Sequence, residues 1–363
     1  IECVWECIYL KAWVLHDIGT ISYEDVDIPM PGHDEVLVNV KAAGICGSDI
    51  GRIYRDGAHV MPLIPGHEFS GIIEKTGKSV DKSLQGKRVG IFPLIPCGKC
   101  TACAKGNYEM CHDYSYLGSR RDGGYAEYVT VPKWNVMELP DGVSYEAAAM
   151  FEPMAVAVHT MRRIDMSECK TAAVIGLGTI GLLLTMFLAD KGVPHIIAIG
   201  NKRSQQRIIQ EMENENAKYF DGKNQNVTAL INDYTDGCGV DVVFECVGNN
   251  ITIGQAINIT GDGGNVCFVG NPKSDIHFDK NTYWRILRKQ IRITGTWNSS
   301  YMGCTGNYVD DWRYVMNRIE EGKIHPEWLI SHRFDLEGLT KGLEIMRDKS
   351  EEYIKIMCVM DGN

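Results

Sequence analysis

The pattern of apolar and polar positions changes near residue 170. Before that point, from residue 11 to about residue 140, apolar residues occur in short alternating runs broken by Gly and Pro, a pattern typical of strands. After it, short apolar runs are separated by segments long enough for helices. The first region therefore predicts a strand-rich, barrel-like domain. Its clearest predicted strands are residues 35–45, 71–77, 88–92 and 126–131.

The second region begins with an apolar strand, a glycine turn and an apolar helix within residues 171–192. Alternation of strands and helices at this spacing favours a parallel, doubly wound sheet. The chain closes with a predicted helix at residues 310–324 and a predicted strand at residues 352–360. We therefore predict an α/β protein with one barrel-like part and one doubly wound part. The other predicted strands of the second part are residues 195–200, 240–248, 264–270 and 290–297.

Composition limits the function classes. With 37 basic and 47 acidic residues the chain has a net charge of −10, which disfavours a nucleic-acid partner. An apolar content of 44% and a length of 363 residues fit a globular protein with two domains. Residues 1–10 have neither an initiator Met nor the basic start of a signal peptide, and they are too short to span a membrane. We expect them to be an extension, with the natural start near residue 10 or 11.

The chain contains thirteen cysteines, most of them scattered. Scattered thiols without a secretion signal indicate a reducing compartment, so we expect a cytoplasmic protein with no membrane partner. The scattered cysteines are Cys3, Cys7, Cys46, Cys169, Cys238, Cys246, Cys267, Cys304 and Cys358.

The remaining four cysteines, Cys97, Cys100, Cys103 and Cys111, have the spacing CxxCxxCx7C among small and polar residues. Four thiolates in a tetrahedron satisfy Zn2+ completely, so this spacing predicts a closed structural zinc lobe. Disulfides are disfavoured because cysteines this close would be strained and the expected compartment is reducing. The same cysteine spacing is also compatible with an iron–sulfur cluster, which is the alternative interpretation.

Gly176, Gly178 and Gly181 form GxGxxG directly after the predicted strand that ends at residue 175. In this context the first glycine makes a tight turn, the second lets the backbone approach a pyrophosphate, and the third allows close helix packing. The start of the helix then offers free N–H groups to the phosphates. The sequence predicts a dinucleotide site here, although a glycine-rich packing turn without a ligand is the alternative.

The end of the next strand indicates which dinucleotide is bound. An NAD site normally has an acidic residue there to hold the ribose 2′-hydroxyl. This chain instead has Gly200, Asn201, Lys202 and Arg203, so nothing acidic repels a 2′-phosphate and two cations can pair with it. We therefore predict a preference for NADP. The alternative is that the two cations only form a solvated helix start beside a permissive NAD site.

Residues with catalytic potential lie in the first region. Cys46 occurs in CGSD, and His67 with Glu68 occurs in GHEFSG. A thiolate, an imidazole and a third ligand would leave one zinc position open for water or substrate. Glu152, near the domain junction, is the candidate for the third ligand. Taken singly, a buried cysteine or histidine is more often inert, so the prediction depends on the combination.

Two further residues of the CGSD segment have predicted roles. Asp49 can accept the second N–H of His67 and fix its tautomer. Ser48 can hydrogen-bond an alkoxide and pass its proton outward. Because Zn2+ lowers the pKa of a bound alcohol, hydride can then leave from carbon at neutral pH. The predicted metal and the predicted hydride acceptor therefore belong to one mechanism.

Together these motifs resemble those of the zinc-dependent medium-chain dehydrogenases. GHEFSG, followed by Gly77 and Val80, matches that family's GHExxGxxxxxGxxV, and the cysteine lobe and the glycine turn occur in the family's order. The similarity covers almost everything from residue 11 to about residue 360. It implies a GroES-like catalytic domain at residues 1–160 and 297–363, and a Rossmann domain at residues 161–296. It also implies homodimers or homotetramers.

By motif, the resemblance assigns Cys46, His67 and Glu152 as catalytic zinc ligands, with Glu68 as an alternate ligand. It assigns the four-cysteine lobe to a structural zinc ion. The residues that we expect to contact the cofactor are Gly176, Gly178, Thr179, Ile180, Gly181, Gly200, Asn201, Lys202, Arg203, Val247, Val269, Thr294 and Thr296.

Within the family the chain is most similar to the polyol branch, in which Glu occupies the third-ligand position as Glu152 does here. Several segments resemble dehydrogenases of polyol phosphates such as galactitol 1-phosphate. Residues 200–203 depart from the family's NAD-using members because they lack the acidic residue at the end of the strand. This departure favours NADPH as the cofactor, and NADPH in turn favours reduction of a ketose phosphate. A phosphate group requires one or two arginine forks, although charged surface residues are the simpler reading of each candidate. The candidates for substrate contact are Arg52, His59, Arg120, Arg121, Arg288 and Lys289.

Two other functions stay open at this stage. One is a dehydrogenase of free polyols of the sorbitol or xylitol type. The other, from a different class, is a non-catalytic dinucleotide-binding protein that keeps only the structural zinc. The presence of Cys46, Ser48, His67 and Glu152 argues against the second, because a chain without catalytic function should have lost at least one of them.

Overall fold

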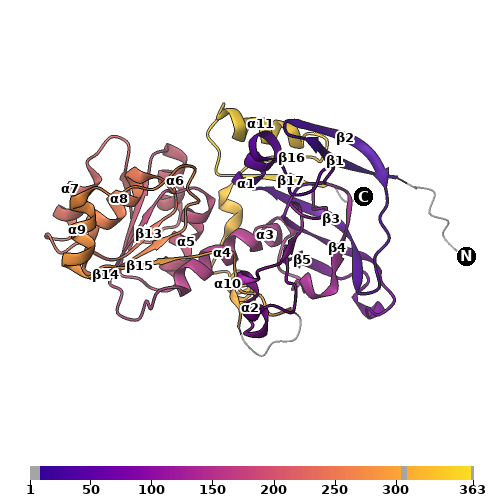
Figure 1. Ribbon diagram of the computed structural model, residues 1–363, viewed down its shortest axis with the longest axis horizontal. Coiled ribbons are helices and arrows are strands. Elements are labelled where there is room, and N and C mark those ends of the chain that lie inside the picture. Colours follow the sequence, from indigo (N-terminus) through magenta and orange to yellow (C-terminus); the bar gives the residue numbers. More distant parts are fainter. Residues whose placement is uncertain (1–8, 304–308, 361–363) are drawn as a thin grey trace, which may run out of the picture. The chain divides into compact units, whose positions relative to one another are not determined.

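The computed structural model describes residues 9–303 and 309–360 (Figure 1). The chain divides into two compact units, one of Ile1–Glu152 with Ser300–Asn363 and the other of Pro153–Ser299. Tyr9 and Leu10, the last two residues of the predicted extension, belong to the first strand, and Leu10 is buried. The rest of that extension, including Cys3 and Cys7, lies outside the described residues, as does Cys304.

The first unit is built on a seven-stranded sheet with the order β16-β17-β3-β4-β5-β9, and β8 pairs with β3. β3 lies inside the sheet, where β17, β4 and β8 pair with it, and most of its residues are apolar and buried. The pairs within this sheet are antiparallel except β16 with β17. The strands are β3 (Glu35–Ile45), β4 (Glu68–Thr76), β5 (Arg88–Ile91), β8 (Tyr128–Pro132), β9 (Val136–Glu138), β16 (Ile330–Phe334) and β17 (Lys355–Val359).

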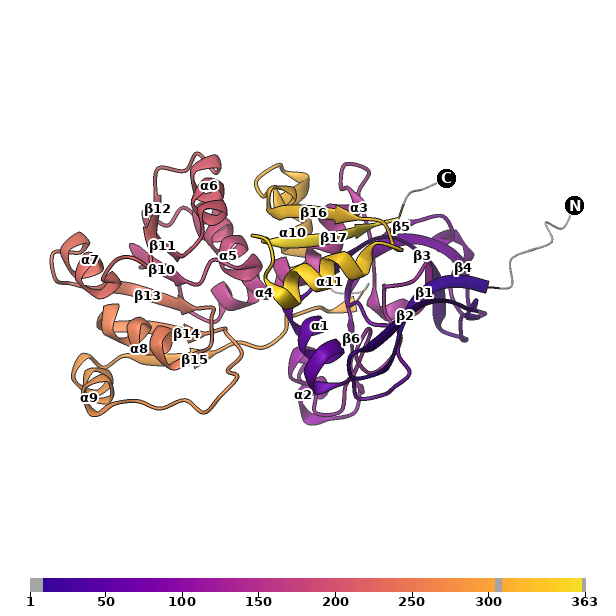
Figure 2. The same ribbon diagram turned by 90° about the horizontal axis from the view of Figure 1, so that it is seen from above.

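Two small sheets and several short helices complete this unit (Figures 1 and 2). Strands β1 and β2 form a hairpin, and β6 pairs with β7. Helix α3 packs against β3, β4 and β5. The elements are β1 (Tyr9–Asp17), β2 (Thr20–Asp27), β6 (Leu94–Ile95), β7 (Ser115–Tyr116), α1 (Gly47–Gly51), α2 (Thr101–Ala104), α3 (Tyr145–Ala149), α10 (Asp311–Glu320) and α11 (Leu339–Asp348).

The second unit contains a six-stranded parallel sheet with the order β12-β11-β10-β13-β14-β15. The predicted parallel, doubly wound sheet is therefore confirmed. The elements are β10 (Thr171–Ile175), β11 (His195–Gly200), β12 (Ala217–Asp221), β13 (Val240–Glu245), β14 (Thr260–Phe268), β15 (Arg292–Gly295), α5 (Thr179–Asp190), α6 (Arg203–Glu211), α7 (Val227–Tyr234), α8 (Asn250–Ile259) and α9 (Lys280–Lys289). Helix α4 (Phe151–Arg162) begins in the first unit and continues into the second.

Alternation along the parallel strands explains how the sheet is covered on both faces. Ala173 and Ile175 of β10 face a core that includes Ile231 of α7 and Ile257 of α8. The intervening Val174 is equally buried, and α5 packs against the same strand. Strands buried on both faces need continuous apolar runs, as these segments have. None of the helices in the described part of the chain is both long and apolar enough to cross a lipid bilayer.

Candidate active site and metal centres

Strand pairing brings together residues that are distant in the sequence. Cys46 follows β3, His67 immediately precedes β4, and Glu68 is the first residue of β4. The register pairs Gly44 of β3 with Glu68 of β4, so the end of one strand adjoins the start of the other. Cys46, His67 and Glu68 each offer a ligand atom, and these atoms lie within 4.8 Å of one another. The donors are a thiol, an imidazole and a carboxylate, all of which Zn2+ accepts.

Asp49 is the centre of a hydrogen-bond network behind this group. It is fully buried on α1, and its Oδ2 accepts from the Cys46 N–H at 3.0 Å and from the Tyr125 hydroxyl at 2.8 Å. Its Oδ1 lies 3.2 Å from His67 Nδ1 and accepts from Arg52 Nη1 at 2.5 Å. Burial by itself raises the pKa of Asp49, but His67 and Arg52 hold that pKa well below its ordinary value. Asp49 therefore stays charged beside the imidazole, within ion-pair distance of its Nδ1 atom.

The pKa of His67 lies well above its ordinary value. Desolvation acts against this, while the Asp49 carboxylate and Cys46 favour the charged ring. Ser48 follows Cys46 on α1 and has an exposed side chain. Tyr125 was not predicted from the sequence. Its ring occupies the space beside Gly66, where an added Cβ would lie 2.5 Å from a ring carbon.

Glu152 lies near Cys46, His67 and Glu68 but is not among the residues whose ligand atoms lie within 4.8 Å of one another. It is in the first turn of α4, and its Oε1 accepts from the Tyr116 hydroxyl at 3.2 Å. The Tyr116 ring in turn lies 5.7 Å from the His67 ring. Desolvation raises the pKa of Glu152 to about 7, His67 opposes this, and the neighbouring Glu68 carboxylate adds to it. The structure thus brings Glu68, rather than Glu152, closest to Cys46 and His67.

The carboxylate of Glu68 is already paired with a positively charged side chain. Its carboxylate forms an ion pair with Lys355 of β17, and each side chain is only 2% exposed. Lys355 Nζ also donates to the Ile45 carbonyl at 3.1 Å. Burial lowers the pKa of Lys355, but Glu68 and Cys46 outweigh this, and the net shift is upward. Gly44 leaves room for the pair, because an added Cβ would lie 2.4 Å from Glu68 Oε2.

Lys355 was also missed in the sequence. It lies in an apolar strand far from the catalytic motifs, and only the pairing of β17 with β3 brings it to Glu68. A single lysine among the buried residues of such a strand was the available signal, because lysine is almost never fully buried unless it is paired.

Replacing Lys355 by methionine should destabilise the metal-free protein. Removing one partner of a buried ion pair costs about 3–5 kcal/mol because the other charge stays buried. Zinc should then raise Tm more in Lys355→Met than in the wild type, since the unpaired Glu68 faces the metal group. Thermal unfolding with and without zinc measures this, with Lys341→Met on the exposed side of α11 as the control. Equal zinc-induced shifts in Lys355→Met and the wild type would contradict the role given to the pair.

The predicted substrate residues differ in what their side chains already contact. Arg52 is held by Asp49, and His59 is exposed. Arg121 donates to Glu35 Oε1 at 2.6 Å and to Thr130. Arg120 stacks over the Tyr114 ring at 4.5 Å, and its Nη1 donates to the Tyr114 carbonyl at 3.1 Å. Its Nε has no hydrogen-bond partner among residues 9–303 and 309–360.

The two predicted substrate residues of the second unit lie at the end of α9. Arg288 is exposed. Lys289 Nζ donates to the carbonyl of Thr260, the first residue of β14, at 2.7 Å. That contact is at the amino edge of the sheet, opposite the glycine turn, and does not favour a role for Lys289 in the reaction.

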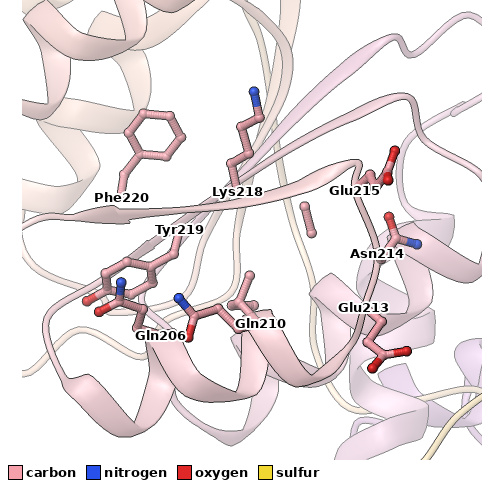
Figure 3. Close-up of a pocket in the computed structure, with 10 residues that line it drawn as sticks. Gln206, Gln210, Glu213, Asn214, Glu215, Lys218, Tyr219 and Phe220 are labelled. Carbon is pink, nitrogen blue, oxygen red and sulfur yellow. The ribbon is translucent and has the colours of Figure 1, made fainter.

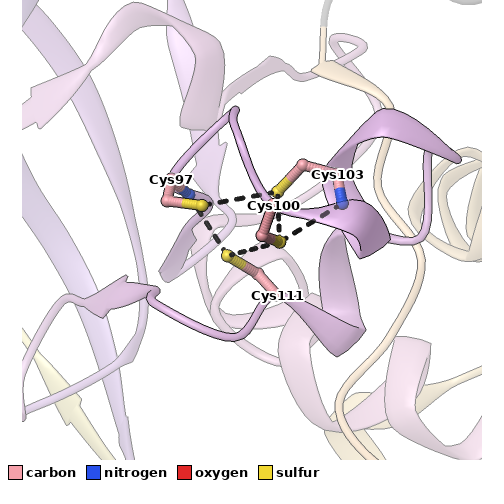
Figure 4. Close-up of side chains that lie close together, drawn as sticks. All are labelled: Cys97, Cys100, Cys103 and Cys111. Atoms are coloured by element: carbon pink, nitrogen blue, oxygen red, sulfur yellow. Dashed lines mark hydrogen bonds between the residues drawn. The ribbon is translucent and has the colours of Figure 1, made fainter.

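The four cysteines of the lobe surround one point (Figure 4). All four sulfur atoms lie within 4.8 Å of one another, with Cys100 Sγ at 3.5 Å from Cys103 Sγ. The Cys103 N–H and then the His112 N–H lower the pKa of Cys100 to about 6, whereas burial and the Cys100 hydrogen bond raise that of Cys103 to about 12. The four thiols therefore need a cation to be deprotonated together. The chemistry of the donor set fits Zn2+.

The glycine turn has the geometry that a pyrophosphate requires. Gly176 has a φ of +94°, and a Cβ added at Gly181 would lie 2.0 Å from the Gly176 carbonyl oxygen. Nothing lies within 4 Å of a Cβ built on Gly178, the residue that precedes α5, so its backbone is open to a ligand. Thr179 and Ile180 form the first turn of α5. These residues fit a dinucleotide.

The other predicted cofactor residues gather mostly at the carboxyl edge of the parallel sheet. Gly200 ends β11, Asn201 is exposed, Lys202 is the N-cap of α6 and Arg203 is its first residue. Val247, Val269 and Thr296 follow β13, β14 and β15, whereas Thr294 lies inside β15. The carboxyl edge is where doubly wound sheets bind ligands.

A separate open pocket lies between α6 and β12 (Figure 3). Gln206, Gln210, Glu213 and Lys218 line it together with Tyr219 and Phe220. It contains none of the predicted site residues, and we assign it no role.

Comparison with known proteins identifies the family. Residues 32–141 match the alcohol dehydrogenase GroES-like domain, and residues 179–321 match the zinc-binding dehydrogenase domain. Galactitol 1-phosphate 5-dehydrogenase of Escherichia coli K12 is 32% identical over 92% of this chain and 95% of its own length. The chain belongs to the zinc-dependent medium-chain dehydrogenases. The predicted GroES-like and Rossmann parts are thereby confirmed.

Two other similar proteins are a dehydrogenase named for a free polyol and a dehydrogenase whose structure contains NADP. Sorbitol dehydrogenase of Bacillus subtilis is 30% identical, with 96% of each chain covered. The structure of a zinc-binding dehydrogenase from Sinorhizobium meliloti bound to NADP superimposes with a TM-score of 0.87 and 28% identity, covering 97% of this chain and 99% of that chain. The family is one of oxidoreductases that use zinc and a nicotinamide cofactor.

Proposed function

We propose that this dehydrogenase transfers hydride between NADP(H) and a secondary alcohol or ketone of a polyol phosphate. The observation that carries the catalytic assignment is the close group of the partly buried Cys46 and the buried His67, with two carboxylates, Glu68 and Glu152, beside it. Glu68 is already neutralised by Lys355. Glu152 is desolvated and accepts only a neutral hydroxyl from Tyr116 in its described hydrogen bond. A cation bound by Cys46 and His67 would satisfy Glu152, which supports the predicted ligand set of these three residues.

The roles of the residues follow from their positions. When bound, Zn2+ supplies a Lewis acid that lowers the pKa of the substrate hydroxyl. Asp49 keeps His67 in the orientation that leaves its other nitrogen for the metal, and Tyr116 restrains Glu152. Ser48 takes the proton of the substrate hydroxyl and passes it to water. A nicotinamide cofactor held at the glycine turn would accept the hydride of the carbinol carbon, so that the alcohol would become a ketone and NADP+ would become NADPH.

The preference for NADP is supported by the end of β11. Gly200 there provides no carboxylate, and Lys202 and Arg203 lie at the start of α6, where a ribose 2′-phosphate would be bound. The homologue from Sinorhizobium meliloti that carries NADP is consistent with this preference. The phosphorylated substrate is supported by the similarity to the galactitol 1-phosphate enzyme and by Arg120. A free polyol is the second candidate, supported by the similarity to sorbitol dehydrogenase.

A panel of substrates tests the proposed function directly. Galactitol 1-phosphate, galactitol, sorbitol and xylitol should each be assayed with NADP+ and with NAD+. We expect the highest kcat/KM for the phosphate with NADP+. A higher kcat/KM for the free polyols would favour the second candidate. No turnover with any substrate, together with a single zinc-binding site, would favour the non-catalytic alternative.

Arg120 and Arg121 form a matched pair for testing the phosphate. The charge of Arg121 is already neutralised by Glu35, whereas the described contacts of Arg120, with the ring and the carbonyl of Tyr114, leave its charge available. Only Arg120→Gln should therefore weaken phosphate binding. A charge-assisted hydrogen bond is worth about 1.5–3 kcal/mol, so KM for the polyol phosphate should rise roughly 10- to 100-fold. The KM for a free polyol should be unchanged. Equal effects of the two variants would count against Arg120 as the phosphate contact.

A further inference from the structure

Two turns beside the glycine turn are packed tightly at the carboxyl edge of the parallel sheet. A Cβ added at Gly176 would lie 2.4 Å from Val247 Cγ2, and one added at Gly270 would lie 2.2 Å from the Gly248 nitrogen. The strand order runs outward from β10 in both directions, with β11 on one side and β13 on the other. Ligands of doubly wound sheets bind at this switch point. Val247, 42% exposed, therefore stands where a dinucleotide passes from one half of the sheet to the other.

Glu245 fixes both of these turns. It is the last residue of β13 and is fully buried. Its Oε1 accepts from the Val247 N–H at 2.9 Å and from the Gly248 N–H at 3.0 Å, and its Oε2 lies 3.1 Å from the same Gly248 nitrogen. Its carbonyl accepts from the N–H groups of Val269 at 2.8 Å and Gly270 at 3.0 Å. Consecutive backbone N–H groups form a natural cradle for an anion, and here the chain's own carboxylate occupies it.

In the other half of the sheet, a second side-chain oxygen also accepts from two consecutive backbone N–H groups. Gln205 is buried beside the end of β11, and its Oε1 accepts from the Asn201 N–H at 2.8 Å and the Lys202 N–H at 3.1 Å. In doubly wound sheets the first half, β10 to β12 here, binds the adenosine part of the dinucleotide, and the second half binds the other part. Gln205 and Glu245 therefore hold the loops for opposite ends of one ligand.

We propose that Glu245 is a positioning residue for the nicotinamide half of the cofactor. Its carboxylate does not contact the cofactor; it holds Val247 beside the glycine turn, and Val247 presents the surface on which that half rests. This inference rests on the proposed function only in needing a nicotinamide dinucleotide, not in the choice between NADP and NAD.

Comparing the whole cofactor with its adenosine fragment tests the proposal. Glu245→Leu keeps the volume but removes both acceptor atoms. The Kd for NADPH, measured by calorimetry, should rise about tenfold or more, because buried N–H groups lose their partner. The Kd for 2′,5′-ADP should change by less than about twofold, since that fragment binds the other half. Glu245→Gln retains Oε1 as an acceptor and should restore most of the NADPH affinity.

Gln205→Leu is the matched control, because it removes the corresponding acceptor at the adenosine half and should weaken both ligands. Equal weakening of both ligands by Glu245→Leu, or no weakening of NADPH, would overturn the proposal. If Glu245→Leu does not fold, Val247→Gly removes the positioned side chain itself and should give the same selective loss. A wild-type protein that prefers NADH would refute only the proposed NADP preference, and NADH with 5′-AMP would then make the same comparison.

Discussion

Replacing His67 by alanine should abolish turnover while leaving the fold in place. His67 lies in the group of possible ligands with Cys46 and Glu68 and is 4% exposed, with Asp49 behind it. Loss of a metal ligand removes Lewis-acid stabilisation worth several kcal/mol, which corresponds to roughly a 10³-fold or larger decrease in kcat. Steady-state kinetics measures the decrease, and circular dichroism with thermal unfolding checks the fold.

The control for this variant is His33→Ala, because the His33 side chain is 69% exposed and pairs only with the neighbouring Asp34 in its described ion pair. Its turnover should stay within about twofold of the wild type, as expected for surface substitutions. Turnover of His67→Ala within tenfold of the wild type would contradict the assignment of His67 to the reaction. Loss of the folded signal in His67→Ala would instead mean that His67 is mainly structural.

Replacing Lys202 and Arg203 together by alanine should remove the preference for NADP. Two charge-assisted hydrogen bonds to a 2′-phosphate are each worth about 1.5–3 kcal/mol. The ratio of kcat/KM for NADP+ to that for NAD+ should therefore fall by at least about 100-fold. Most of the change should appear in the KM for NADP+, because NAD+ lacks the phosphate that these side chains would bind.

Arg207→Ala provides the matched control for that double variant. Arg207 lies on the same helix, α6, but its guanidinium is 3.3 Å from Glu211 and 72% exposed. The cofactor ratio should not change in this control. A wild-type enzyme that already prefers NAD+, or a double variant with an unchanged ratio, would contradict the interpretation of residues 200–203.

The parts of the site that the sequence predicted best depend on short spacings. The sulfur atoms of Cys97 to Cys111 converge because the intervening loops are too short to separate them. GxGxxG likewise follows its strand directly, so its turn depends only on nearby residues. Cys46 and His67 required one further assumption, that the strands before and after them pair, and the β3–β4 register brings them together.

The parts that could not be predicted depend on contacts between distant segments. Lys355 reaches Glu68 only because β17 pairs with β3, a register that nothing local in the sequence specifies. In the sequence Glu245 is only the last residue of an apolar strand. The positioning role that we propose for it depends on the turn whose N–H groups donate to its carboxylate. The choice between Glu68 and Glu152 depends in the same way on where Lys355 lies.

Stepwise removal of zinc tests the central claim most directly, namely that one zinc ion is catalytic and the other is structural. A chelator should be titrated into the enzyme while released zinc, turnover and Tm are followed together. A catalytic site keeps an open position that a chelator can enter, whereas four thiolates enclose a structural ion. We expect about one equivalent of zinc to leave first, abolishing turnover with little change in Tm, and the second to leave only as Tm falls. Full turnover after the first equivalent has left, or turnover lost only together with the fold, would contradict the assignment.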